Sequence, residues 1–276
     1  MRYLTIAAIV AAASLTACSA AEESGDDEQP GLLATTGVWA DVAGAVTGQE
    51  VEAIITGTEI DPHHFEPAAQ DLAKVKAAAT LVANGGGYDA SLYTAADQDN
   101  VINAFDLAGH DHDDHHDHSV NEHVWFSPDA ITAVAKEVQA RAGGDAGDVE
   151  KRMQALKQKI ADLPHLHVMQ TESIADHLIA GSEMHDVTPD GYRHAALNEA
   201  EPSVSDVAEA MTKIDSGEVD VLIFNPQSAS NAAQRLVDAA KAKGVKIVEI
   251  TELPPAGTDV LDYIEQVTDS LVQAAK

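Results

Sequence analysis

The chain has 276 residues, of which 46 are acidic and 16 are basic, so its formal net charge is −30. A surface of this charge repels nucleic acid and anionic lipid head groups, which excludes both as partners. Hydrophobic residues make up 45% of the chain, enough to build the core of one large domain or two medium ones.

The N-terminal residues indicate export. Residues 4–13 form an apolar run with the length of a signal-peptide core, too short to span a bilayer. Leu15-Thr16-Ala17-Cys18 resembles a bacterial lipobox, which implies a signal peptide over residues 1–17 and lipid on Cys18. An ordinary signal peptide followed by an incidental cysteine is the alternative, but a single cysteine can form no internal disulfide. The acidic segment 18–30 is then a flexible tether, anchored only by lipid to the outer face of the bacterial cytoplasmic membrane.

After the tether, short β-like runs alternate with helical runs. The first half predicts strands at 32–36, 50–56, 80–83 and 101–104, and helices at 38–46, at 68–78 and from Pro128 onward. The second half predicts strands at 167–170, 219–224 and 245–250, and helices at 173–179, 203–214, 229–243 and 258–274. Such alternation predicts an α/β fold with parallel sheets covered by helices. A charged helix over 148–164 links an N-terminal lobe, 31–147, to a C-terminal lobe, 165–276.

Six of the thirteen histidines fall between His110 and His123, interleaved with aspartates. No apolar residue occurs from His110 to Ser119, so residues 109–119 are expected to form a solvated loop. Neutral imidazole is a good ligand for zinc and its neighbours, which makes this His-rich loop a candidate accessory metal site. The histidines proposed for it are His110, His112, His115, His116 and His118. A polar tract without a function is the alternative.

Other potential ligands follow predicted strands, where ligands bind in open parallel sheets. His63 and His64 follow the strand at 50–56, and His123 follows the strand at 101–104. Glu172 and Glu252 follow two strands of the second lobe. Four nitrogen and oxygen ligands that converge on a cleft between the lobes suit zinc, or a harder cation such as manganese.

The order of three motifs resembles a known family. Asp61-Pro62-His63 with Phe65-Glu66-Pro67 is similar to the DPHxYEP motif of the ZnuA/TroA-type (cluster A-I) solute-binding lipoproteins, which supply metal to ABC importers. Glu122-His123-Val124-Trp125 and Glu201-Pro202-Ser203 resemble two further elements of that family. The resemblance implies two (β/α) lobes joined by a long helix, with one metal in the cleft. It also implies a monomer that performs no enzymatic chemistry and delivers its divalent ion to a permease.

The resemblance also assigns roles to residues. It implies that His63 and His123 are the first two metal ligands, with Glu172 as the third and Glu252 as the fourth. Glu66 and Glu122 could accept hydrogen bonds from the ligand imidazoles. Three alternatives stay open: His64 could replace His63, Glu172 could cap the next helix, and water could replace Glu252.

The metal ion and the class of protein each have a second candidate. The His-rich loop favours zinc, whereas Glu172 and Glu252 favour manganese or ferrous iron. The general affinity order places zinc above manganese, so zinc is predicted and manganese is the alternative. A zinc hydrolase or an adhesin is a less favoured function, since the chain has no HExxH motif. His165 and His167 stand at the start of a predicted strand and are expected to face solvent.

Overall fold

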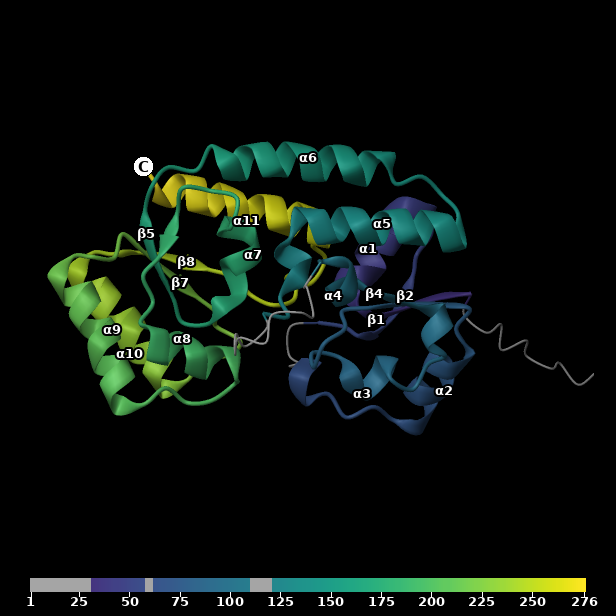
Figure 1. Cartoon of the computed structure of the whole chain (residues 1–276), viewed down its shortest axis with the longest axis horizontal. Helices are drawn as coiled ribbons and strands as arrows, with labels where there is room; N and C mark the ends of the chain where they lie inside the picture. The colour runs from purple at the N-terminus through teal and green to yellow at the C-terminus, as the bar shows by residue number, and fades with distance from the viewer. Residues whose placement is uncertain (1–30, 58–61, 110–120) are drawn as a thin grey trace, which may run out of the picture.

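The computed structural model describes residues 31–57, 62–109 and 121–276 (Figure 1). Cys18 and the five accessory histidines of the His-rich loop therefore lie outside the described residues. Two four-stranded parallel sheets, each with helices packed around it, form two lobes. The predicted α/β fold class is confirmed.

The N-terminal lobe contains a sheet with the strand order β2-β1-β3-β4. Its strands are β1 (Leu32–Thr36), β2 (Glu52–Ile55), β3 (Thr80–Ala83) and β4 (Val101–Asn103). Its helices are α1 (Gly37–Thr47), α2 (Ala69–Ala77), α3 (Ala90–Tyr93), α4 (Ala104–Leu107) and α5 (Pro128–Ala142), with 3-10 turns at Pro62–His64, Gln98–Asn100 and Val124–Phe126. β3 lies in the middle of the sheet and is buried along its whole length, as its apolar sequence predicts.

The C-terminal lobe repeats this topology with the strand order β6-β5-β7-β8. Its strands are β5 (His167–Gln170), β6 (His185–Asp186), β7 (Val221–Phe224) and β8 (Lys246–Glu249). Its helices are α7 (Asp176–Ile179), α8 (Asp190–Leu197), α9 (Val204–Ser216), α10 (Asn231–Lys243) and α11 (Val260–Ala274), with a 3-10 turn at Ser173–Ala175. β6 and α8 were not predicted, and the helix expected over 173–179 is divided between the 3-10 turn and α7.

Helices α6 (Gly147–Ala161) and α11 lie side by side along both lobes (Figure 1). The Arg152 guanidinium of α6 donates to the carboxylates of Asp262 and Glu265 in α11, over 2.6 and 2.9 Å. At the start of α11, close to these two carboxylates, the backbone N–H of Val260 donates to Asp41 of α1. The C-terminal helix therefore ties the second lobe to the first.

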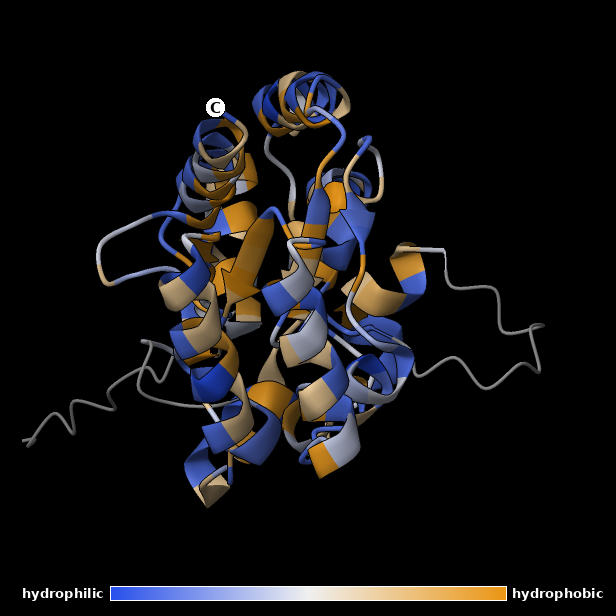
Figure 2. Ribbon diagram, turned by 90° about the vertical axis from the view of Figure 1, so that its left-hand side faces the viewer, coloured by the Kyte–Doolittle hydropathy of each residue, from blue (hydrophilic) through white to orange (hydrophobic). Residues whose placement is uncertain are grey.

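One hydrophobic core continues from the first lobe into the second. Val221 and Ile223 of β7 belong to this shared core, while Leu222 and Phe224 on the opposite face pack in a separate core with α9 and α10. Figure 2 shows the hydrophobic ribbon concentrated in the strands between the helices. Among the described residues, none of the helices has the length and apolar character needed to cross a membrane.

Candidate metal centre

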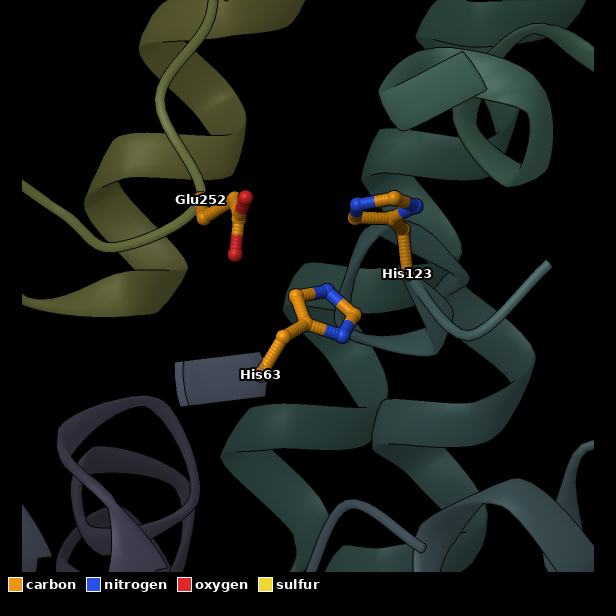
Figure 3. Close-up of side chains that lie close together, drawn as sticks. All are labelled: His63, His123 and Glu252. Carbon is orange, nitrogen blue, oxygen red and sulfur yellow. The ribbon is translucent and has the colours of Figure 1, made fainter. Parts of the chain in front are cut away.

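Three of the four predicted ligands come together between the lobes. One potential ligand atom from each of His63, His123 and Glu252 lies within 4.8 Å of the other two. The side chains point toward a common space (Figure 3). His63 lies in the 3-10 turn after β2, His123 precedes the turn Val124–Phe126, and Glu252 follows β8. The cluster therefore combines two imidazoles of the first lobe with a carboxylate of the second.

Glu172 lies beside this cluster and contacts one of its members. Its Oε1 atom is 3.1 Å from Nε2 of His123. Its Oε2 atom accepts a hydrogen bond from Nδ2 of Asn225 over 2.7 Å and another from the Ser228 hydroxyl. The Glu172 side chain makes no capping hydrogen bond to the 3-10 turn that follows it. The carboxylate is thus held in the cleft, next to a predicted ligand nitrogen.

The buried His123 ring is oriented by an amide. Its Nδ1 atom lies 2.7 Å from Oδ1 of Asn121, and because an amide oxygen only accepts, Nδ1 carries the proton. Nε2 is then the atom that offers a lone pair to a metal. Nδ2 of Asn121 in turn donates to Asp176 of the second lobe, which Arg193 binds as well. A hydrogen-bonded chain thus runs from Arg193 across the lobe boundary to His123.

His63 has a partner that sequence analysis did not select. Its Nδ1 atom lies 2.7 Å from Oε1 of Glu199, on the segment that follows α8. Glu199 has a backbone φ of +52°, the only positive value for a residue other than glycine in the described part of the chain. This conformation is uncommon for glutamate and is a recurrent feature of functional sites. Glu66, which the sequence suggested for this role, is exposed.

Buried aromatic rings pack behind both imidazoles. The centroid of Tyr88 lies 4.7 Å from that of His63, and Trp125 lies 5.1 Å from His123. Tyr88 and Trp125 also contact each other at 4.7 Å. The Tyr88 hydroxyl donates to Oε2 of Glu252 over 3.2 Å, so the same ring touches ligand candidates from both lobes. These contacts restrict the rotation of the imidazoles and preorganise the cluster.

Glu122 occupies a different place from the one its motif suggested. Its carboxylate accepts a hydrogen bond from the backbone N–H of Gly87 and packs against Gly86, where a Cβ atom would lie 2.5 Å from the carboxylate oxygen. Its backbone carbonyl accepts from the Asn84 side chain over 2.9 Å. Glu122 therefore fixes the segment that carries His123 to the glycine turn after β3.

The cleft is strongly acidic. The pocket at the cluster has a volume of about 250 Å³ and is lined by Glu172, Glu199, Glu201 and Glu252 together with His63 and His64. None of its described lining residues is a lysine or an arginine. Glu172 and Glu252 are largely buried, where negative charge is unfavourable without a positive partner, so the pocket favours a bound cation.

A proton competes with a metal ion for the position between His123 and Glu172. Burial alone would lower the pKa of His123, but its hydrogen bond to Glu172 and the charges of Glu172 and Glu252 outweigh burial and raise that pKa. Burial would likewise raise the pKa of Glu172, yet the contact with His123 lowers it. The site therefore favours an imidazolium between carboxylates when no metal is bound, and a divalent cation can replace that proton.

Comparisons with known proteins show the family and the fold of the chain. The family described as Zinc-uptake complex component A, periplasmic, matches residues 32–274. Zinc-binding lipoprotein AdcA of Streptococcus pneumoniae is 24% identical over 259 residues. This match covers 81% of this chain and 47% of AdcA, so the chain spans about half the length of that relative.

Solved structures share the fold at low sequence identity. The periplasmic zinc binding protein TroA from Treponema pallidum has a TM-score of 0.66 and 17% identity, with 89% of this chain and 99% of TroA covered. The solute-binding protein FpvC from Pseudomonas aeruginosa, in complex with Mn²⁺, has a TM-score of 0.65 and 17% identity, with 89% and 97% covered.

The family and the fold are those of substrate-binding proteins of ABC importers, not those of enzymes. The chain belongs to the family of Zinc-uptake complex component A, the extracytoplasmic family whose ZnuA/TroA-type motifs its sequence resembles. The predicted family is confirmed.

Proposed function

We propose that this protein captures zinc in the cleft between its lobes and delivers it to the permease of an ABC importer. The observation that carries the proposal is the convergence of His63, His123 and Glu252 from two lobes, with ligand atoms within 4.8 Å of one another. The matched family and the zinc-binding relative AdcA support zinc as the ion.

The proposed ligands are His63, His123, Glu252 and Glu172. Two neutral imidazoles and two carboxylates neutralise the charge of a divalent ion and complete a tetrahedral site. Zinc ligand atoms lie about 2.0–2.2 Å from the ion, so they stand roughly 3.5 Å apart and a small closure of the cluster suffices. A site filled by protein ligands retains an ion as cargo, whereas a hydrolytic zinc site keeps an exchangeable water.

Loading of the site is proposed to tighten the contact between the lobes. An ion bound by His63 and Glu252 links the two lobes directly, next to the chain through Asn121 that already joins them. The ion also replaces the proton held between His123 and Glu172. The permease would then recognise the loaded arrangement of the lobes, which differs from the protonated one in charge and closure.

Manganese is the second candidate ion. Its sites favour carboxylate oxygens, which Glu172 and Glu252 provide, and the fold neighbour FpvC was solved with Mn²⁺. The general affinity order nevertheless favours zinc at any site that both ions can enter.

Several further parts of the proposal concern export and organisation. We propose lipid on Cys18, a monomeric protein, and a linking role for the predicted helix 148–164 between lobes 31–147 and 165–276. The His-rich loop 109–119 is proposed as a weak first acceptor that passes metal to the cleft.

The test is metal content and competitive titration of the full chain, without an affinity tag of histidines, beside a variant that lacks residues 109–119. One tightly bound zinc that survives loop deletion and is lost in His63→Ala supports the proposal. Zinc held only by the loop, with manganese retained in the cleft, would establish a manganese importer and contradict zinc as the cargo.

A further inference from the structure

Three histidines gather on the C-terminal lobe, away from the cleft. His167 begins β5, His185 begins β6, and His165 precedes β5 by two residues. The ring centroids of His165 and His167 lie 5.1 Å apart, and those of His167 and His185 lie 6.3 Å apart. These three residues are called the edge cluster below.

The parallel pairing of β5 with β6 accounts for this gathering. His167 and His185 are direct partners in the register of the two strands. Hydrogen bonds from His185 N to the Leu166 carbonyl and from Val187 N to the Val168 carbonyl, both 2.8 Å, hold that register. Paired residues of adjacent strands project from the same face, and so do residues two apart in extended backbone. The fold therefore places three imidazoles on one face of the sheet edge.

Within the described part of the chain, the polar contacts of His165 and His167 engage Nδ1 of each ring and not Nε2. Nδ1 of His165 lies 3.1 Å from the carbonyl oxygen of Glu183. Since a carbonyl only accepts, Nδ1 of the neutral ring carries the proton and Nε2 offers its lone pair. The Asp220 carboxylate accepts from the backbone N–H of His167 over 2.8 Å and lies 3.8 Å from its Nδ1. Asp220 therefore fixes the backbone at the start of β5 and places a negative charge near the His167 ring.

The spacing of the rings suits a shared ion. Zinc lies about 2.1 Å from a ligand nitrogen in tetrahedral sites, which places the centroids of two coordinating rings about 5 Å apart. The His165–His167 pair has this spacing, and the His167–His185 pair exceeds it by about 1 Å. His165 and His185 are exposed and His167 is half-exposed, so rotation of their side chains can close that gap.

The edge cluster is separate from the candidate site in the cleft. His167 is the first residue of β5, whereas Glu172 lies beyond the other end of that strand. Five residues of extended chain at about 3.3 Å each put the two positions roughly 16 Å apart. No ion can touch both.

We propose that His165, His167 and His185 form a second metal site, which binds one Zn²⁺, Ni²⁺ or Cu²⁺ ion through imidazole nitrogens. These are the divalent ions that imidazole ligands suit. The site is weaker than the cleft because its ligands are neutral and partly solvated. The bound ion would also clamp β6, a strand of two residues at the edge of the sheet, onto β5.

The test is the modification of individual histidines by diethyl pyrocarbonate, read by peptide-resolved mass spectrometry, on the full chain with and without Zn²⁺. At a Zn²⁺ concentration about ten times the dissociation constant, the rates at His165 and His185 should fall about tenfold. Peptide resolution separates these rings from the His-rich loop. Unchanged rates at His165 and His185 in the unsubstituted chain would overturn the proposal without any variant.

Variants then test whether one ion shared by the three rings protects His165 and His185, or whether zinc protects each ring separately. In His167→Asn, Zn²⁺ should no longer protect His165 and His185, while His194→Asn, at an exposed histidine of α8, should leave that protection intact. In His63→Ala the protection should also persist, so failure of the proposed cleft site and failure of the edge cluster are distinguishable. Full protection of His165 and His185 in a folded His167→Asn chain, checked by circular dichroism, would contradict a site of three histidines.

Discussion

The two lobes share one strand order but offer different chemistry to the cleft between them. The N-terminal lobe contributes the imidazoles of His63 and His123, which pack against buried aromatic rings. The C-terminal lobe contributes the carboxylates of Glu172, Glu199 and Glu252, which contact the imidazoles or line the pocket beside them. The same topology thus positions packed imidazoles in one lobe and negatively charged carboxylates in the other. The difference lies in the loops after the strands and not in the strands themselves.

This division indicates how the proposed site would respond to a cation. Neither lobe alone supplies the proposed ligand set, because the first lobe contributes the imidazoles of the cleft and the second contributes the carboxylates. A proton on His123 bridges that ring and Glu172, whereas a divalent ion would contact His63 and Glu252 as well. Substitution of the histidines, substitution of the glutamates and a change of pH should therefore lower zinc affinity by different amounts.

The largest effect is expected from the imidazole side. His63→Ala or His123→Ala should weaken zinc binding more than about 100-fold, because changes behind a ligand already cost about 10–100-fold. Competitive titration with a zinc chelator measures this loss. His64→Ala is the matched control, since His64 lines the same pocket at the adjacent position and is exposed. A larger loss in His64→Ala than in His63→Ala would transfer the ligand role to His64.

The carboxylate side should show a graded response. Glu252→Gln keeps the shape of the side chain and removes the charge within the cluster of three, so zinc affinity should fall by about 100-fold or more. Glu172→Gln should cost about 10–100-fold, because Asn225 and Ser228 also bind this side chain. Competitive zinc titration of both variants shows which substitution lowers the affinity more. The reverse order would make Glu172 the principal carboxylate ligand.

The pH dependence tests the balance between proton and metal. Since Glu172 and Glu252 raise the pKa of His123 despite its burial, zinc must displace a proton below that raised value. Affinity should be constant above the pKa and fall about tenfold per pH unit below it for each proton released. Glu172→Gln removes a charge that raises the pKa, so the fall should begin at lower pH. An onset at the same pH in both proteins would contradict this coupling.

The smallest effect is expected behind His63. Glu199→Gln removes the carboxylate that contacts Nδ1 of His63, and because Glu199 is half-exposed, zinc affinity should fall by about tenfold or less. Glu201→Gln removes the same charge from the pocket lining and serves as the control. Equal losses in both variants would show that Glu199 acts through its charge alone and does not orient His63.

Much of this arrangement was predictable because strand periodicity and strand ends are local properties. The strand at 32–36 has the predicted bounds, and the positions of His63, His123 and Glu252 after strands follow from the rule for parallel sheets. β6 was missed because two residues carry no periodicity, and α8 because its sequence is short and mixed in polarity. The contact between Glu199 and His63 could not be predicted, since it depends on how the two lobes face each other.

The measurement that tests the central account most directly is zinc-edge anomalous diffraction from crystals of the chain loaded with one equivalent of Zn²⁺. The account predicts one dominant peak between the lobes, about 2.1 Å from ring nitrogens of His63 and His123 and from an oxygen of Glu252. A dominant peak whose ligands all come from one lobe, or one at the edge cluster with none in the cleft, would contradict it.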